Sequence, residues 1–202
     1  MFVSKILSIP FFYLWLKPKI YGKEKNKSNA PVILIHNHTS YWDPCVANTC
    51  FITKKVHFMA THKIFEYNKF VSWVLGQLGA FPVERGLGKS DAVVDKCVKM
   101  LKDNTVLVIA PEGRIYNDGK IHEFRTGVAR IAIESGTEVI PMYIRKRKSW
   151  WNRTHISLGE RINLKEKYGE IKDYEALTKI CEDLRKEMAR ISKRDGFDVP
   201  LD

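Results

Sequence analysis

The sequence lacks several features that would place it in a specialised protein class. Its four cysteines form no CxxC pair and follow no secretory signal, so we interpret them as free thiols in a reducing compartment. It has no GxSxG sequence, the turn on which α/β-hydrolases carry a nucleophilic serine. It also lacks internal repeats and linker-like segments. A chain of 202 residues that is 45% hydrophobic is therefore expected to form one globular domain without disulfides.

No apolar run near the N-terminus is long enough to span a membrane. Residues 2–16 are apolar and aromatic, but as a helix they would extend about 22 Å, short of the roughly 30 Å hydrocarbon core, and Pro10 would kink them. Residues 1–30 contain six lysines and one glutamate. Aromatic residues beside lysines are typical of a segment in the lipid headgroup region. We predict an N-terminal interfacial membrane-binding helical segment over residues 1–30, with simple packing on the domain as the alternative.

Acidic residues are few relative to basic ones, 23 against 34, which gives a net charge of +11. An anionic partner is therefore expected: nucleic acid, an anionic membrane surface or acidic substrates. Residues 145–153 combine basic residues with two tryptophans, a composition that suits base stacking as well as docking on anionic lipid or an acidic carrier protein. We favour membrane or carrier and expect no nucleic acid, which leaves a basic nucleic-acid-binding module as the different-class alternative.

Apolar segments alternate with amphipathic ones along the rest of the chain. Apolar, often β-branched runs predict strands over 32–35, 56–60, 79–83, 105–110, 139–144 and 154–158. Helical spacing of apolar residues predicts helices over 44–52, 63–78, 89–102, 127–135 and 173–191. This interleaving predicts a single α/β domain, residues 31–202, with a largely parallel mixed sheet flanked by helices.

Three of the predicted strands end in polar loops: residues 37–43, 84–86 and 112–114. If these strands run parallel, the three loops meet at the carboxyl edge of the sheet. His38 and Asp43 are spaced so that the carboxylate can bond one imidazole nitrogen and leave the other free, as in a general base with its orienting acid. His36 with this pair could instead bind metal, but we expect none because no further ligand has the usual spacing. Cys45 could be argued as a nucleophile; a small buried residue is the favoured interpretation.

Four short blocks resemble the glycerolipid acyltransferases, in particular the bacterial 1-acyl-sn-glycerol-3-phosphate (lysophosphatidic acid) acyltransferases. Residues 37–43 match NHxSxxD, and FPVER at 81–85, PEG at 111–113 and VIP at 139–141 are similar to the later blocks in order and interval. The third block departs from the common EGTRS form. Ile115 stands at the usual arginine position and Arg114 one place earlier, a variant of family branches that acylate other lysophospholipids.

The resemblance implies the activity of an acyltransferase domain. A fatty acyl group would move from an acyl-carrier protein or acyl-coenzyme A thioester to the free hydroxyl of 1-acyl-glycerol-3-phosphate, which gives phosphatidic acid without cofactor or metal. His38 would act as general base and Asp43 would orient it. Another lysophospholipid acceptor, or a thioester hydrolase, are alternatives within the enzymes. The implied location is the cytoplasmic face of the cell membrane.

The same resemblance assigns the substrate-binding residues. Arg85, Arg114 and Arg125 are candidates to bind the acceptor phosphate, since arginine can hold two of its oxygens. Glu112 would bind or order the acceptor, either by bonding a glycerol hydroxyl or by fixing an arginine. Gly113 would let the backbone approach closely.

Overall fold

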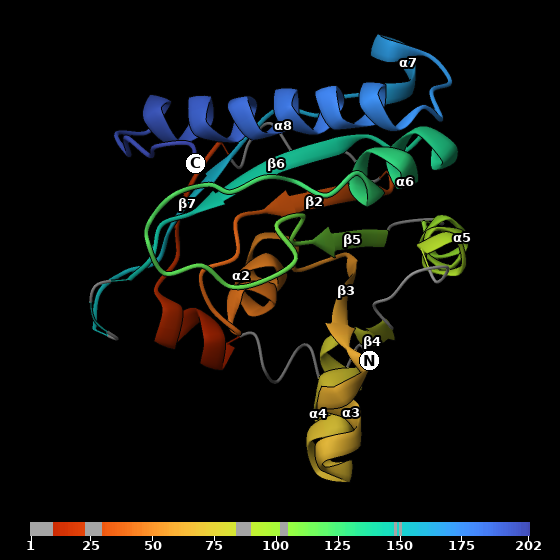
Figure 1. The fold of residues 1–202 in the computed structure, drawn as a ribbon. Helices are drawn as coiled ribbons and strands as arrows, with labels where there is room; N and C mark the ends of the chain where they lie inside the picture. The colour runs from red at the N-terminus through yellow and green to blue at the C-terminus, as the bar shows by residue number, and fades with distance from the viewer. Residues whose placement is uncertain (1–9, 23–29, 84–89, 102–104, 148, 150) are drawn as a thin grey trace.

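The structure is a computed structural model that describes residues 10–22, 30–83, 90–101, 105–147, 149 and 151–202. Its described strands form one seven-stranded sheet in the order β1-β7-β6-β2-β5-β3-β4, with helices on both faces (Figure 1). The strands are β1 (Lys19–Tyr21), β2 (Val32–His36), β3 (Lys55–Thr61), β4 (Ala80–Val83), β5 (Thr105–Ile109), β6 (Val139–Ile144) and β7 (His155–Leu158). The helices are α2 (Asp43–Cys50), α3 (His62–Tyr67), α4 (Lys69–Leu78), α5 (Ser90–Met100), α6 (Gly127–Ser135), α7 (Leu164–Tyr168) and α8 (Tyr174–Arg194); residues 10–16 are also helical.

The sheet is parallel except between β6 and β7, which pair antiparallel, so the predicted α/β class and largely parallel mixed sheet are confirmed. Central strand β2 is buried on both faces. Ile33 and Ile35 pack in the cluster that includes α5, α6 and α8, whereas Val32 and Leu34 pack with α2 and residues 10–16. A strand covered on both sides has no solvent face, which explains its continuous apolar sequence.

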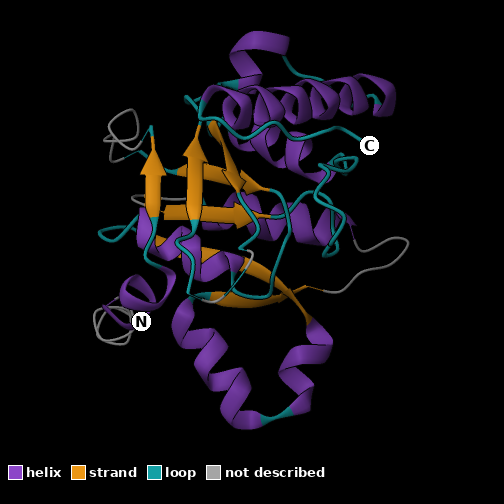
Figure 2. Ribbon diagram, turned by 90° about the vertical axis from the view of Figure 1, so that its left-hand side faces the viewer, coloured by secondary structure: helices purple, strands orange, loops and turns teal. Residues whose placement is uncertain are grey.

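The single helix predicted over residues 63–78 is wrong, because the chain breaks at Asn68. The backbone of Asn68 is extended, and its side chain accepts the N–H groups of Phe70 and Val71, which begins α4 and ends α3. The helical spacing of apolar residues continues across the break, so spacing alone could not reveal it. Helices α3 and α4 form a hairpin that projects from the sheet beside edge strand β4 (Figure 2).

Residues 10–22 pack on the domain, the alternative stated above, and residues 19–21 add an edge strand that the sequence did not predict. Strand β1 pairs parallel with β7, and Phe12 and Leu16 are buried against α2. Helix α7 was also not predicted. Among the described residues, none of the helices combines the length and apolar character needed to cross a bilayer. The membrane role of residues 1–30 and the division from a domain of residues 31–202 stay predictions, and residues 1–9 lie outside the described part.

Candidate active site

The loop between β2 and α2 places His38 against Asp43. The Nδ1 atom of His38 lies 2.9 Å from Oδ2 of Asp43, which also accepts the backbone N–H groups of Thr39 and Ser40 at 2.8 and 2.9 Å. The other oxygen, Oδ1, accepts the Thr39 hydroxyl at 3.0 Å. Asp43 is buried, while the His38 side chain is 21% exposed. Because the carboxylate only accepts, Nδ1 carries a proton and the lone pair of Nε2 is left free.

Asn37 attaches the start of this loop to the neighbouring strand. Its side-chain Nδ2 donates to the carbonyl oxygen of Ile144 at 2.9 Å, and its Oδ1 accepts the Ile144 N–H at 2.7 Å. The amide group therefore pairs with the end of β6 as a backbone peptide would. The sequence includes Asn37 in the first block but gives no indication of this partner, which is distant in the chain.

Glu112, which follows β5, also contacts the loop. Its Oε2 accepts the N–H of His38 at 2.8 Å and its Oε1 accepts the N–H of His122 at 3.1 Å. The side chain is buried, and this burial raises the pKa of its carboxyl group above the ordinary value, although both N–H groups favour the charged form. The loops after β2 and β5 thus meet as predicted. Both oxygens contact the backbone, and the expected contact of Glu112 with an acceptor hydroxyl or an arginine stays a prediction.

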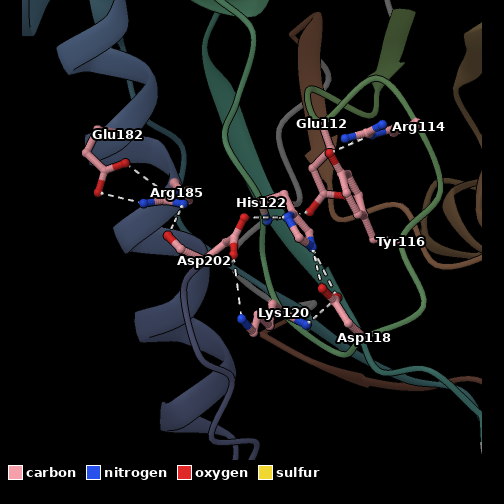
Figure 3. A network of polar contacts seen from close by, with 9 residues as sticks. All are labelled: Glu112, Arg114, Tyr116, Asp118, Lys120, His122, Glu182, Arg185 and Asp202. Carbon is pink, nitrogen blue, oxygen red and sulfur yellow. Dashed lines mark hydrogen bonds and ion pairs between the residues drawn. The ribbon is translucent and has the colours of Figure 1, made fainter.

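A polar network that the sequence did not predict continues beyond Glu112 (Figure 3). The two ring nitrogens of His122 lie 2.9 Å from carboxylate oxygens of Asp118 and Asp202. The imidazole of His122 is therefore held between two carboxylates. Tyr116 stacks on the imidazole ring, and its backbone N–H donates to the carbonyl oxygen of His38. The network therefore supports the His38 loop from its backbone side.

An apolar cavity of about 380 Å³ opens beside His38. Its walls come from β3, β4, β5, α5 and α6, and include Met59, Val83, Val93, Ile109, Val128 and Ile131. Arg125 and Gly113 also line it. Gly113 has φ +75°, and a Cβ there would lie 2.6 Å from Nε of Arg125. The absence of a Cβ at Gly113 thus makes room for the Arg125 side chain, and its approach to a substrate stays a prediction.

The other two predicted arginines have different placements. Arg114 is exposed, its Nε donates to the hydroxyl of Tyr116 at 2.7 Å, and its guanidinium lies over the Tyr116 ring. It is absent from the described lining of the cavity beside His38. Arg85 lies outside the described residues, as do the rest of residues 84–86. The structure therefore brings His38, Asp43, Glu112, Gly113 and Arg125 together, and it places Arg114 at the periphery.

The structure also describes the residues of the two alternatives, a metal site at His36, His38 and Asp43 and a nucleophile at Cys45. Ligand atoms of His36, His38 and Asp43 lie within 4.8 Å of one another, but Nδ1 of His36 contacts the Asn37 carbonyl oxygen at 2.7 Å. Burial lowers the pKa of His36. Both Asp43 oxygens already accept hydrogen bonds, so a cation bound there would have to displace them. Burial also raises the pKa of Cys45 to about 12, which makes that thiol a poor nucleophile.

Replacing Glu112 by glutamine should lower the free energy of unfolding by about 1–3 kcal/mol at neutral pH. Each carboxylate oxygen accepts one backbone N–H group, so the NH₂ of a glutamine amide would have to face one of these two N–H groups. The loss should grow as pH falls. Because the folded-state pKa of Glu112 is raised, the wild-type protein takes up a proton and gains stability on acidification, whereas glutamine cannot.

Urea unfolding of both proteins at about pH 5.5 and about pH 7.5 measures this difference. Glu123→Gln is the matched control, since Glu123 is exposed in the same segment and its replacement should change the free energy of unfolding by less than about 0.5 kcal/mol. A Glu112→Gln variant as stable as wild type at both pH values would contradict the bridging role.

The fold and site together define an α/β protein with a histidine–aspartate pair at the carboxyl edge of a parallel sheet, beside an apolar cavity. The acyltransferase family model matches residues 17–145, which is more than half of the chain. The chain therefore belongs to the acyltransferase family, and the resemblance predicted from the four blocks is confirmed.

Individual relatives agree with this assignment. The chain is 25% identical over 143 residues to the chloroplastic 1-acyl-sn-glycerol-3-phosphate acyltransferase LPAT1 of Arabidopsis thaliana, covering 70% of this chain and 39% of that protein. It is 29% identical over 133 residues to the 1-acyl-sn-glycerol-3-phosphate acyltransferase of Borreliella burgdorferi, covering 64% and 52%. It thus spans only about half or less of these relatives. The crystal structure of the acyltransferase PlsC from Thermotoga maritima shares the fold, with a TM-score of 0.64 at 19% identity over 96% of this chain and 80% of that one.

Proposed function

We propose that this protein is a 1-acylglycerol-3-phosphate O-acyltransferase, which makes phosphatidic acid from lysophosphatidic acid and an acyl thioester. The names of the relatives support the reaction, and the observation that carries it is the position of His38. This residue is paired with Asp43 and lines an apolar cavity. A base with a free Nε2 therefore borders a space suited to a hydrocarbon chain.

The chemistry follows from these two residues. Nε2 of His38 takes the proton of the acceptor hydroxyl while the hydroxyl oxygen attacks the thioester carbonyl. The negative charge of Asp43 stabilises the imidazolium that results. When the tetrahedral intermediate collapses, the carbon–sulfur bond breaks and the imidazolium returns its proton to the leaving thiolate. The balance is one new ester and one free thiol, and no covalent acyl-enzyme is needed.

Substrate placement is divided between the cavity and the arginines. The aliphatic walls suit the fatty acyl chain, because its burial removes apolar surface from water. Arg125 borders the same cavity and, of the two predicted phosphate ligands that the structure describes, is the better placed. Arg85 and Arg114 stay candidates, Arg114 only if its contact with Tyr116 is exchanged for a phosphate. Glu112 acts as a positioning residue through its contacts with the backbone.

One assay tests the proposed reaction. Purified protein is incubated with a labelled acyl thioester, on either acyl-carrier protein or coenzyme A, and with a panel of lysolipids, and the products are identified by mass. We expect phosphatidic acid from lysophosphatidic acid. Free fatty acid as the only product would indicate a hydrolase, and product from a different lysolipid alone would move the acceptor to that lipid. The nucleic-acid alternative requires tight, steeply salt-dependent binding of DNA or RNA.

The proposed reaction uses lipid substrates, and we propose that the protein docks on the anionic cytoplasmic face of the cell membrane. Exposed aromatic residues support contact with a bilayer. On the α3–α4 hairpin, Tyr67, Phe70 and Trp73 are 87%, 70% and 61% exposed. Phe11 and Leu14 on helical residues 10–16 are 64% and 74% exposed. Both elements lie toward the lower side of the molecule in Figures 1 and 2. This arrangement favours two apolar contacts with one bilayer surface.

Replacing Phe70 and Trp73 together by serine should weaken binding to phosphatidylglycerol vesicles by at least about tenfold, because two large apolar side chains no longer enter the bilayer. Co-sedimentation with vesicles measures the partition. The matched control is Tyr174→Ser, since Tyr174 is 72% exposed at the start of α8, on the opposite side of the sheet from α2. Equal partition of the double variant and wild type would contradict docking through the hairpin.

A further inference from the structure

A second cavity, of about 260 Å³, lies on the other side of the His38–Asp43 loop, and we call it the Arg147 cavity. Helical residues 10–16, the loop with the start of α2, and the chain that leaves β6 enclose it. Its described lining residues are Trp15, Leu16, Thr39, Ser40, Trp42, Asp43, Val46, Ile144, Arg145, Lys146, Arg147 and Thr154. It shares none of these residues with the lining of the apolar cavity beside His38. The loop therefore separates two distinct spaces.

The Arg147 cavity contains buried donors that have no acceptor. Within the described part of the chain, the Nε and Nη2 atoms of Arg147 are buried without a hydrogen-bond partner, and so is the hydroxyl of Thr154, a residue only 2% exposed. Arg147 as a whole is half-buried, but its guanidinium keeps its charge at all physiological pH values, so leaving two buried nitrogens without an acceptor is costly. Its face lies 5.6 Å from the centroid of the Trp15 ring, a cation–π contact that satisfies none of the N–H groups. An acceptor is what this arrangement lacks.

The charges around the Arg147 cavity favour an anionic acceptor. Arg145 and Lys146 also line it, and Lys146 is partnered by Asn117 through its Nζ. Asp43 is the one carboxylate among the described lining residues, and its oxygens already bond His38, Thr39 and Ser40. The described lining of the cavity therefore has a positive field and no carboxylate free to pair with Arg147.

The remaining walls are apolar. Trp15 and Trp42 meet edge to face with ring centroids 5.0 Å apart, and Leu16, Val46 and Ile144 complete the lining. Phosphate is the lipid group that guanidinium and hydroxyl donors bind best, and apolar walls suit the hydrocarbon joined to it. A free phosphate ion would leave this apolar surface unused.

We propose that the Arg147 cavity binds the phosphate group of a glycerophospholipid, held by Arg147 and Thr154. The cavity borders the first sequence block, but Arg147 and Thr154 lie outside all four blocks and beyond the family match, which ends at residue 145. Two sources have this chemistry: the phosphomonoester of a lysophosphatidic acid acceptor and the phosphodiester of a bilayer lipid. Binding does not require turnover, so it can be tested whether or not the proposed acyl transfer is correct.

Calorimetric titration of the full chain with soluble dihexanoyl phosphatidic acid and dihexanoyl phosphatidylglycerol tests the site. Arg147→Gln should weaken binding of at least one lipid about tenfold or more, and Thr154→Val about threefold, because each removes a donor to phosphate. Arg153→Gln is the matched control, an exposed arginine of the same segment, and should bind within about twofold of wild type. Thr154→Val should unfold at a temperature no lower than wild type, since its hydroxyl has no partner to lose.

The source is identified by a second comparison. If the ligand is the acceptor, the monoester binds more tightly and Arg147→Gln raises the KM for lysophosphatidic acid while kcat is retained. If it is a bilayer lipid, the diester binds as well as the monoester and the variant loses vesicle binding instead. The proposal is overturned if wild type binds neither lipid, if dihexanoylglycerol without phosphate binds equally, or if Arg147→Gln and Thr154→Val bind both lipids as wild type does.

Discussion

Replacing His38 by alanine should lower the rate of acyl transfer by about 10²–10⁴, the usual contribution of a general base. The acceptor is an alcohol, which is a weak nucleophile at neutral pH unless its proton is removed as it attacks. Nε2 of His38 is free to take that proton because Nδ1 is held by Asp43. The expected change is in kcat at saturating substrates, measured by release of free thiol from the acyl thioester.

The fold should tolerate this replacement. The His38 side chain is 21% exposed, and its described polar contact is with Asp43, while its backbone N–H keeps the bond to Glu112. The thermal midpoint of the alanine variant should therefore stay close to that of wild type. Transfer at the wild-type rate by a folded His38→Ala protein would exclude the general-base mechanism.

Replacing Asp43 should give the second largest loss of acyl-transfer activity, and the size of this loss should depend on the residue that replaces it. Alanine removes the acceptor of the Thr39 and Ser40 N–H groups as well as the partner of His38, so both the loop and the imidazole lose their position. Since hydrogen bonds to a charged group are worth about 1.5–3 kcal/mol, we expect Asp43→Ala to lose stability by at least that amount. Its transfer rate should approach that of His38→Ala.

Asparagine at position 43 should reduce activity and stability less than alanine, because the Thr39 hydroxyl can also accept a hydrogen bond. The amide oxygen can keep the place of Oδ2, where three N–H groups point, and the amide nitrogen can take the place of Oδ1 and donate to the Thr39 hydroxyl. His38 then keeps its orientation and loses only the charge that stabilises the imidazolium. The expected reduction in kcat is about 10- to 100-fold.

Steady-state kinetics and urea unfolding of Asp43→Ala, Asp43→Asn and Thr39→Val test this order. Thr39→Val is the matched control, since it removes only the bond to Oδ1 and should lower kcat by less than about fivefold. We infer that the Thr39 hydroxyl can donate to the carboxylate of Asp43 and accept from the amide of asparagine. If Asp43→Asn were as inactive and as unstable as Asp43→Ala, this inference would be wrong.

The fold and half of the site were predictable because their signals are local. The apolar run of β2, the polar loop and Pro44 in the first turn of α2 mark a strand, a turn and a helix start within a short stretch. The pairing of His38 with Asp43 is also a contact between near neighbours. The meeting of the loops after β2 and β5 followed from parallel strand direction alone.

The remainder depends on contacts between distant parts of the chain. His122 and Asp202 are separated by 80 positions, and nothing in the local sequence of either indicates the other. The block identifies Glu112 as a candidate site residue, but its backbone partners depend on the path of two loops. Asn68 ends a helix within an unbroken apolar pattern, where the cap outweighs spacing. The cation–π contact between Arg147 and Trp15 requires β1 to pair with β7, a pairing too short to detect.

The pairing of Asn37 with Ile144 means that a side chain sets the effective length of the sheet. The ladder between β2 and β6 ends at His36, and the Asn37 amide supplies one more donor and acceptor in the place of a further backbone pair. Aspartate lacks the donor and leucine lacks both, so neither could extend the ladder in this way. The position at which the sheet ends and the turn that carries His38 begins therefore depends on the side chain of a single residue.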